Sequence, residues 1–346
     1  MWTVRCFEPQ DCARLNDLYN TVFRGSRTIE RWKWKFLDSP AAGEGPPIVV
    51  AESDGQLIGA YPAITSLFKA SGSIIRAAQP VDNAILPTFQ GRGIQRAMWN
   101  LWIKEAARQG FSLCWGFPNP AAFRIGIRVL KYIPVAAASV MKFDLEQGVV
   151  RKLQRKLSHR VSRVCGLGAL ARTITSNGKK LKLRPLERFD ERADLLLQES
   201  AGKSRFGVFR DHCYLNWRYF TMPQSAFTGF QLESEKELIG YIILRTKVEN
   251  RNVIGYIYDL TSVCPEKYGD ILLSAAIRFF LNRSACKVRS LTWPHDPAFP
   301  CLESWGFSEE DLQPFSLIIY PLSDIPDRDA LKDIKNWNVC LGDTDL

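Results

Sequence analysis

The sequence predicts a mixed α/β fold of two similar halves, each with a central, mixed, mostly antiparallel sheet flanked by helices. Three observations support this prediction. Apolar strands separated by short turns dominate residues 47–86. A strand, a glycine-bearing loop and an amphipathic helix follow one another in residues 80–110. Several short motifs recur in the same order in the second half of the chain, which favours a duplication.

The composition is that of a globular protein with room for two domains. The chain has 346 residues, of which 46% are hydrophobic and 24% charged. No apolar run has the length of a membrane span, and the first residues, MWTVRCFEPQD, lack the basic and apolar regions of a secretory signal. The nine cysteines are odd in number and scattered, with no C-x-x-C pair. We therefore expect a cytoplasmic protein with free thiols.

The elements of the first half follow from apolar spacing and turn residues. A strand at residues 2–7 precedes a helix that opens after Pro9, and a second, short helix carries Ile29 to Phe36. Strands then continue to Leu86, with turns near Gly55 and Gly72. The remaining elements are a helix from Ile94 to Gly110, a strand at 111–117, a helix at 120–130 and an apolar strand at 135–145. The predicted order is β-α-α-β-β-β-α-β-α-β.

The recurring motifs keep identical internal spacing. They are R-x-x-E-x-x-D at 5–11 and 184–190, W-K-F at 34–36 against W-R-Y at 217–219, L-I-G at 57–59 and 238–240, and Asp82 against Asp259. The predicted domains are an N-terminal domain (1–148), a basic linker helix (149–182) and a degenerate C-terminal domain (183–346). The C-terminal domain has P-E-K-Y-G-D where the first has the glycine loop, and its two acidic residues would repel an anion.

The net charge of +10 arises in one segment. Ten Lys or Arg and no acidic residue lie in residues 151–183, and apolar residues recur there at three- and four-residue steps. This pattern predicts a cationic amphipathic helix in the first part of the segment. Two interpretations stay open: a linker helix with a solvated basic face, or peripheral association with an anionic membrane through 150–183. A nucleic-acid surface along the whole chain is not expected.

The glycine loop predicts an anion site. Gly91 and Gly93 leave room for a close-approaching phosphate, Arg92 adds a cation, and the N-terminus of the next helix offers free N–H groups. Neither a P-loop nor a dinucleotide-binding fingerprint is present. The best-suited ligand is a diphosphate, although a plain strand-to-helix turn would have the same glycines.

The spacing from Gln90 to Gln95, after a strand that stops at Pro87, resembles motif A of the GNAT N-acetyltransferase superfamily. In that family Gln or Arg, two residues, Gly, one residue and Gly or Ala hold the pyrophosphate of coenzyme A; Gln95 departs from this pattern. The resemblance implies two GNAT-like domains and acetyl-CoA as co-substrate. No metal is expected, because the three histidines are isolated and no two have a metal-ligand spacing. The coenzyme A-binding residues that it implies are Ile85, Leu86, Gln90, Gly91, Arg92, Gly93, Ile94, Gln95, Asn119 and Phe123.

Asn119 and the catalytic candidates extend the resemblance. An Asn that leaves the fifth strand commonly contacts the coenzyme A arm in this family, while a helix cap is the alternative role for Asn119. The family's usual Tyr acid would stand at Gly126, so Tyr132 is the substitute candidate. Asp82 and Glu52 are the candidates for a general base. A structural role for Asp82 is the alternative, because Asp259 recurs in the half without the loop.

The leading functional hypothesis is an acyl-CoA-dependent N-acyltransferase that acts on an amine of a small or carbohydrate-like acceptor in a ternary complex. A Fem-type aminoacyl transferase, which also joins two GNAT-like halves and uses charged tRNA, is the alternative enzyme. A non-catalytic acyl-CoA-binding or scaffold protein is the third hypothesis. The intact glycine loop favours coenzyme A over tRNA.

Overall fold

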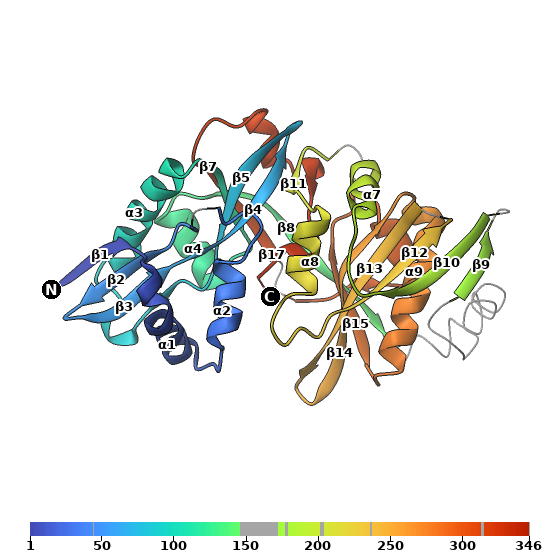
Figure 1. The fold of residues 1–346 in the computed structure, drawn as a ribbon, viewed down its shortest axis with the longest axis horizontal. Helices are drawn as coiled ribbons and strands as arrows, with labels where there is room; N and C mark the ends of the chain where they lie inside the picture. Colours follow the sequence, from blue (N-terminus) through green and yellow to red (C-terminus); the bar gives the residue numbers. More distant parts are fainter. Residues whose placement is uncertain are drawn as a thin grey trace.

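The two halves of the chain repeat one order of elements in a computed structural model of the protein (Figure 1). The structure describes residues 1–43, 45–145, 172–176, 179–200, 204–235, 237–312 and 315–345. The first half contains β1 (Trp2–Cys6), η1 (Pro9–Asp11), α1 (Cys12–Phe23), α2 (Ile29–Phe36), β2 (Val49–Ser53), β3 (Gln56–Tyr61), β4 (Ala63–Ala70), β5 (Ser73–Pro80), β6 (Ala84–Ile85), η2 (Pro87–Phe89), α3 (Ile94–Arg108), β7 (Phe111–Gly116), α4 (Pro120–Arg128) and β8 (Ile133–Asp144).

The second half follows the same plan. It contains β9 (Arg172–Ser176), β10 (Lys179–Leu186), α7 (Arg192–Ser200), β11 (Phe206–Val208), α8 (His212–Tyr219), β12 (Thr228–Ser234), β13 (Glu237–Glu249), β14 (Asn252–Ser262), α9 (Pro265–Leu281), β15 (Lys287–Thr292), α10 (Phe299–Trp305), β16 (Ser308–Glu309) and β17 (Phe315–Pro321), then η3 (Arg328–Lys332), η4 (Ile334–Asn336), β18 (Trp337–Asn338) and η5 (Leu341–Asp343). The mixed α/β class is confirmed. The predicted element order is corrected between α2 and α3, where five strands, β2 to β6, replace the three that were predicted.

Local sequence explains where the equivalent helices α2 and α8 begin. The Thr28 side chain caps α2 by accepting a hydrogen bond from the Arg31 N–H at 3.3 Å, and Asp211 caps α8 by accepting one from the Tyr214 N–H at 2.7 Å. Both are residue types preferred at the N-cap. The equivalent tryptophans, Trp34 in α2 and Trp217 in α8, are both buried and anchor their helices to the core.

The basic segment differs in part from the prediction. Residues 146–171 lie outside the described residues, so the amphipathic helix and its membrane contact stay predictions there. The extension of that helix to residue 182 is corrected, because residues 172–176 and 179–182 belong to two paired strands, β9 and β10. Leu181 and Leu183 are buried while Lys182 is exposed. This period of two is typical of a strand with one buried face.

The final strands of the two halves are exchanged. β8 pairs antiparallel with β17 over residues 133–138 and with β15 over residues 139–144. β17 in turn pairs with β7 through residues 318–321. The last strand of each half therefore lies beside a strand of the other half, and the two sheets join into one of fourteen strands among the described residues. A four-stranded sheet, β1-β2-β3-β6, completes the first half.

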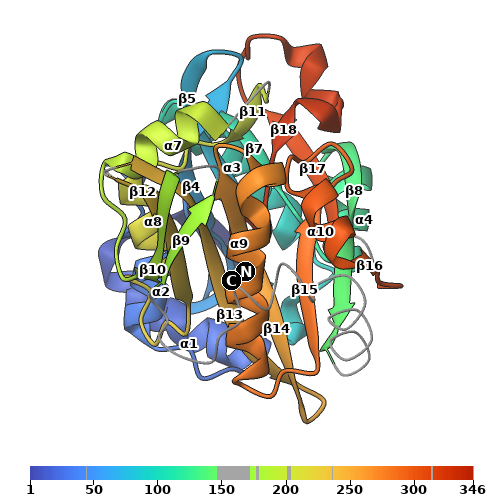
Figure 2. The same ribbon diagram turned by 90° about the vertical axis from the view of Figure 1, so that its right-hand side faces the viewer.

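Helices cover the sheets of both halves. In the first half α3 packs against β1, β2 and β3 of the four-stranded sheet. In the second half α9 packs along β13 and β14 of the fourteen-stranded sheet (Figure 2). The largest buried cluster contains apolar residues of both halves, including Trp34 and Trp217. The halves are therefore joined by a shared core as well as by the exchanged strands. No helix in the described part of the chain is long and apolar enough to span a membrane.

Two features of this fold create an opening in the first half. β5 and β7 pair in parallel only as far as Ala78 and Cys114. Beyond that point the chain leaves β5, and β6 pairs with β3 instead. The strands on either side of the gap thus separate, as the resemblance to the GNAT fold implies. β17 borders the far side of β7, so a strand of the second half contributes to the walls of the opening.

Candidate functional site

A cavity of about 850 Å³ occupies the opening between β5 and β7. It brings the glycine loop, the end of β7 and the start of α4 together, as the sequence predicts for a single site. Its lining includes Tyr61, Gln79, Asp82, Ile85, Gln90, Gly91, Gly93, Ile94, Gln95, Trp115, Gly116, Asn119, Gly126, Tyr132, Ile318 and Asp345. Both halves contribute, because Ile318 lies on β17 and Asp345 follows η5.

The loop has the backbone conformation that its glycines predict. Gly91 has φ = 77° and Gly93 has φ = 79°, a left-handed region that favours glycine. A Cβ atom added at either position would have no atom within 4 Å. Glycine is therefore favoured here by the backbone conformation and not by close packing. Both positions leave open space beside the N-terminus of α3.

The first turn of α3 is available to an anion. Gly93 is its N-cap, and within the described part of the chain no side-chain cap hydrogen bond is formed at this helix start. The N–H groups of this turn and the helix dipole attract negative charge. The side chain of Gln90 donates to the Ile85 carbonyl at 3.2 Å and ties the loop to β6. The Arg92 guanidinium lies 5.1 Å from the centre of the Phe89 ring, on the exposed side of the loop.

Asn119 caps a helix and lies in the lining of the cavity; its contact with coenzyme A stays a prediction. Its Oδ1 atom accepts a hydrogen bond from the Ala122 N–H at 2.9 Å and caps α4. The residue also lines the cavity. Its side-chain NH₂ group has no hydrogen-bond partner among the described residues, so this group can donate to a ligand while the oxygen caps the helix.

Asp82 lines the cavity but is paired with two cations. Its Oδ2 atom accepts hydrogen bonds from Arg27 at 2.6 Å and from Lys35 at 2.7 Å. Burial acts to raise the pKa of Asp82, but the Lys35 and Arg27 charges and their hydrogen bonds outweigh it and hold the pKa below its usual value. Asp82 is therefore ionised at neutral pH and is a weak base.

The structure does not bring every predicted residue to the cavity. Glu52, a predicted candidate for the general base, does not line the cavity, and its carboxylate pairs with Arg5 at 2.9 Å and Arg14 at 3.1 Å. Leu86, Arg92 and Phe123 also do not line it. Leu86 and Phe123 instead pack against buried apolar clusters of the core.

Tyr132 lies beside the position where the family's usual tyrosine is missing. An ideal Cβ on Gly126 would be 3.2 Å from Ile318 Cδ1 and 3.8 Å from Tyr132 Cδ2. The Tyr132 ring therefore lies next to the space that a side chain at 126 would enter. Its hydroxyl is 2.7 Å from the Cys114 Sγ atom, and burial raises its pKa well above the ordinary value. Tyr132 thus keeps its proton and can act only as a donor near neutral pH.

Asp345 is a cavity residue that sequence reasoning missed. Its carboxylate forms an ion pair with Lys35, which also pairs with Asp82, and 37% of its side chain is exposed. The segment before it crosses the centre of the molecule: the Gln79 side chain donates to the Asp343 carbonyl at 3.1 Å, and Arg210 forms a buried ion pair with Asp343. The only local signal was the cluster of acids in residues 343–345.

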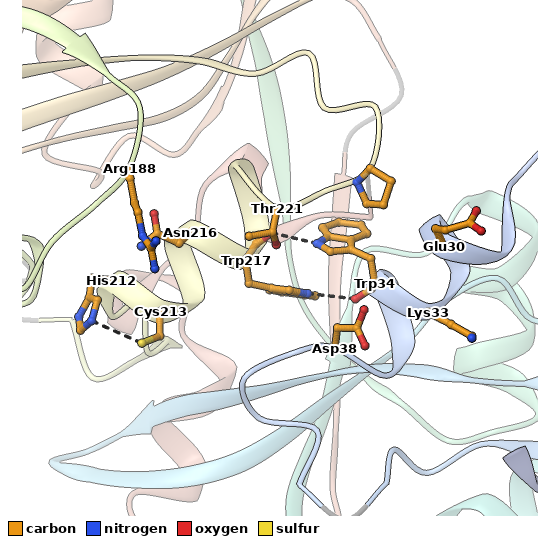
Figure 3. A pocket seen from close by; sticks show the side chains of 11 residues that line it. Glu30, Lys33, Trp34, Asp38, Arg188, His212, Cys213, Asn216, Trp217 and Thr221 are labelled. Carbon is orange, nitrogen blue, oxygen red and sulfur yellow. Dashed lines mark hydrogen bonds between the residues drawn. The ribbon is translucent and has the colours of Figure 1, made fainter.

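A second cavity, of about 600 Å³, lies where α2 and α8 meet (Figure 3). Trp34 and Trp217 line it, together with His212 and Cys213 at the start of α8. The His212 ring donates a hydrogen bond from Nδ1 to the Asp194 carboxylate at 2.8 Å, and this contact raises the pKa of His212. No glycine loop opens into this cavity, so it lacks the feature that defines the first one.

The second half has a different strand-to-helix junction. α9 begins at Pro265, directly after β14 and the N-cap Cys264, with Glu266 in its first turn. Asp259, the counterpart of Asp82, is sealed in the core, where it accepts hydrogen bonds from Tyr241 at 3.1 Å and Thr261 at 2.9 Å. Burial raises the pKa of Asp259, opposite to the direction for Asp82. The two recurring carboxylates therefore have different environments.

Residues 3–127 match the sequence model of the acetyltransferase (GNAT) domain family. No match was found among curated proteins. Many solved structures are similar in fold, and the three described next each match over 92–93% of this chain. A probable N-acyltransferase of Enterococcus faecalis V583 is 14% identical, with 73% of its chain covered and a TM-score of 0.64. A GCN5-related N-acetyltransferase of Anabaena variabilis ATCC 29413 is 12% identical, with 73% covered and a TM-score of 0.64. The Saccharomyces cerevisiae N-myristoyltransferase with bound myristoyl-CoA is 11% identical, with 79% covered and a TM-score of 0.60.

The predicted resemblance to the GNAT superfamily is thereby confirmed. The first half of the chain contains an acetyltransferase (GNAT) domain, which is an enzyme domain. The structural likeness extends the fold of this class over both halves, since it covers more than nine tenths of the chain. At 11–14% identity it concerns the fold alone.

Proposed function

We propose that the protein transfers the acyl group of an acyl-CoA, acetyl-CoA in the first place, to an amine of a small acceptor. The observation that carries this proposal is the uncapped N-terminus of α3 beside Gly91 and Gly93, both with positive φ and open space. Backbone N–H groups at such a helix start suit a pyrophosphate. The same cavity continues into the opening between β5 and β7, where a long, thin ligand fits.

The residues present fit coenzyme A along this path. The N–H groups of residues 91–95 would hold the pyrophosphate. The pantetheine arm would lie between the ends of β5 and β7, where it can accept a hydrogen bond from the free NH₂ group of Asn119. The thioester would then lie toward Asp82, Asp345 and Tyr132, which line the inner part of the cavity.

The chemistry requires an uncharged amine. An acceptor arrives as an ammonium ion, loses a proton, and its nitrogen attacks the thioester carbonyl; the C–N bond forms and the C–S bond breaks. The leaving thiolate then takes up a proton. A thiol has an ordinary pKa of about 8.5, so its departure needs little assistance from an acid. Tyr132, which keeps its proton, supports this step only weakly.

Asp345 suits the role of base better than Asp82. Both carboxylates contact Lys35, but Asp82 also pairs with Arg27 and is only 12% exposed, whereas the Asp345 side chain is 37% exposed. The ammonium of an acceptor would be attracted to this pair, and its proton can pass to Asp345 directly or through water. Asp82 then holds Lys35 in place.

A screen of thiol release tests the proposal. The protein would be mixed with acetyl-CoA and a panel of amines and amino sugars, and free coenzyme A measured with a thiol reagent. Acylation of an amine at a rate above that of Gly93→Glu supports an acyltransferase. Acetyl-CoA binding without release for any amine would instead favour a binding protein. Transfer from charged tRNA without use of acetyl-CoA would favour the aminoacyl transferase alternative.

A further inference from the structure

Three side chains near the start of α8 have the order of a nucleophile, a base and a carboxylate. The Cys213 Sγ atom lies 3.4 Å from Nε2 of His212, and Nδ1 of the same ring lies 2.8 Å from the Asp194 carboxylate. Cys213 and His212 both line the second cavity, and Figure 3 shows the contact between them. In such a series of contacts an imidazole can take the proton of a thiol.

The Asp194 carboxylate, on α7, fixes the orientation of the His212 ring. Its Oδ1 atom accepts a hydrogen bond from the His212 backbone N–H at 2.7 Å, while its Oδ2 atom contacts the ring nitrogen Nδ1. An ionised carboxylate only accepts hydrogen bonds, so Nδ1 carries the proton. In the neutral ring Nε2 is therefore the free base, and Nε2 is the atom that contacts Cys213.

The charges around this pair keep the proton on the thiol until a base removes it. The charged groups that act on the pair are Arg188, Asp190, Glu191, Asp194 and Asp211. The hydrogen bond to Asp194 is the largest cause that raises the pKa of His212. Burial, followed by the charges of Asp211 and Asp194, raises the pKa of Cys213. The thiol is thus protonated near neutral pH, and His212 is placed to deprotonate it.

The surroundings of the thiol suit a carbonyl compound. The buried indole rings of Trp34 and Trp217 line the same cavity and offer an apolar wall. The backbone N–H of Cys213 has no acceptor among the described residues, whereas the N–H groups of residues 212 and 214 bind Asp194 and Asp211. An open N–H beside the nucleophile is a donor for the oxyanion that forms when a thiol attacks a carbonyl carbon.

We propose that Cys213 is the nucleophile of a second acyl-transfer site, where it takes the acyl group of a thioester with His212 as the base and Asp194 as a positioning residue. Nε2 of His212 removes the thiol proton, Sγ attacks the thioester carbonyl carbon, and the Cys213 N–H binds the oxyanion. The bond from this carbon to the leaving sulfur then breaks, and the leaving thiolate takes the proton from Nε2. The products are S-acyl-Cys213 and a free thiol, with no oxidation or reduction.

The groups present favour a thioester over an amide. A thioester exchanges one C–S bond for another, so the leaving thiolate needs only the proton that His212 already holds. The leaving nitrogen of an amide is far more basic and needs a stronger acid. The lining of this cavity contains no glycine, so the site has no loop for a diphosphate, and a thioester without a nucleotide should react. This reaction is independent of amine acylation in the first cavity.

A nucleotide-free thioester tests the proposal. The full chain is incubated with S-acetyl-N-acetylcysteamine at pH 7, and acetylation of each cysteine is followed by mass spectrometry of peptides. Cys6 is the internal control, because Cys6 and Cys213 are the two exposed thiols in the described part of the chain. We expect Cys213 to react about 10²-fold faster than Cys6, and Cys213→Ser to lose only the signal of residue 213. Equal rates at the two thiols would overturn the proposal.

Substitution of the base distinguishes catalysis from simple exposure of the thiol. His212→Asn and His212→Gln, with unchanged circular dichroism, should each lower the acetylation rate of Cys213 by about 10²-fold at pH 7. In the wild type the rate should rise through the pKa of His212, above its ordinary value of about 6.5, and then level off. In the variants it should continue to rise toward the higher pKa of the thiol. A rate unchanged by both substitutions would overturn the proposal.

Substitution of the carboxylate tests the positioning role. Because Asp194 raises the pKa of His212, Asp194→Asn should move the inflection of the pH profile to lower pH and reduce the plateau rate by about 10-fold. A profile identical to that of the wild type would show that Asp194 does not act through His212 and would contradict the proposed arrangement. Failure to acylate any amine would count against the proposed function alone, because acetylation of Cys213 is measured separately.

Discussion

Trp34 and Trp217 form a reciprocal pair across the two halves. The indole N–H of Trp34 donates to the Trp217 carbonyl at 2.9 Å, and the indole N–H of Trp217 donates to the Trp34 carbonyl at 3.0 Å. The rings stack with centroids 5.2 Å apart. These residues are equivalent in the W-K-F and W-R-Y motifs, so the local axis that relates the halves passes between them.

This pair predicts equal effects of equivalent substitutions. Trp34→Phe and Trp217→Phe each leave one buried carbonyl without its donor, and each should lower the free energy of unfolding by about 1–3 kcal/mol. Urea unfolding of the two variants and the double variant measures this, with Trp2→Phe as a control for loss of indole area without loss of a hydrogen bond. An effect confined to one of the two tryptophans would contradict the reciprocal arrangement.

The exchange of β8 and β17 predicts how the first half behaves alone. In the full chain β17 lies between β7 and β8 and brings Ile318 to the cavity. A fragment of residues 1–148 would leave the edges of β7 and β8 unpaired and apolar. We expect this fragment to aggregate or associate. A monomeric fragment with a cooperative unfolding transition and bound acetyl-CoA would show that the exchange is dispensable.

Local patterns predicted much of this fold, because the responsible residues are close in sequence. Gly93 and Asn119 were found from the turn and the helix start they form, and the motif containing Trp34 revealed the repeat. The missed features depend on contacts between distant residues. No residue near Asp345 in the sequence indicates that its carboxylate pairs with Lys35. No pattern in residues 315–321 indicates that this strand pairs with β7. Glu52 is a candidate base from its place in the repeat relative to Asp82, whereas its pairing with Arg5 and Arg14 depends on the packing of β1, β2 and α1.

Asp82 should contribute to stability in a pH-dependent way. Its pKa is lowered in the folded protein, so its stabilising effect is present above the unfolded pKa of about 3.9 and is lost as the pH falls through the folded value. Asp82→Asn should therefore be less stable than the wild type at pH 7, and the difference should shrink below about pH 4. Urea midpoints across this range measure the effect. A constant difference would mean that Asp82 is not ion-paired in solution.

Tyr132 and the two carboxylates should differ in their effect on the rate. Tyr132→Phe removes a proton donor that a thiolate leaving group hardly needs, so kcat/KM should fall by less than about 10-fold. Asp345→Asn removes the exposed carboxylate and should lower kcat/KM by about 10²-fold, with acyl-CoA affinity retained. Thiol-release kinetics at saturating acetyl-CoA give kcat/KM for the amine in each of the three variants, Tyr132→Phe, Asp345→Asn and Asp82→Asn. If only Asp82→Asn lowers kcat/KM this strongly, Asp82 and not Asp345 is the general base.

Calorimetric titration of acetyl-CoA tests the central claim, an anion site at the N-terminus of α3. Gly93→Glu places a carboxylate at this helix start, and Gly55→Glu is the matched control. Both glycines have φ near +78° and open space around the Cα atom, so the cost of placing a side chain on that backbone is similar. We expect acetyl-CoA to bind the wild type and Gly55→Glu with equal affinity. Gly93→Glu should remain folded and should not bind acetyl-CoA. Undiminished affinity in folded Gly93→Glu would contradict it.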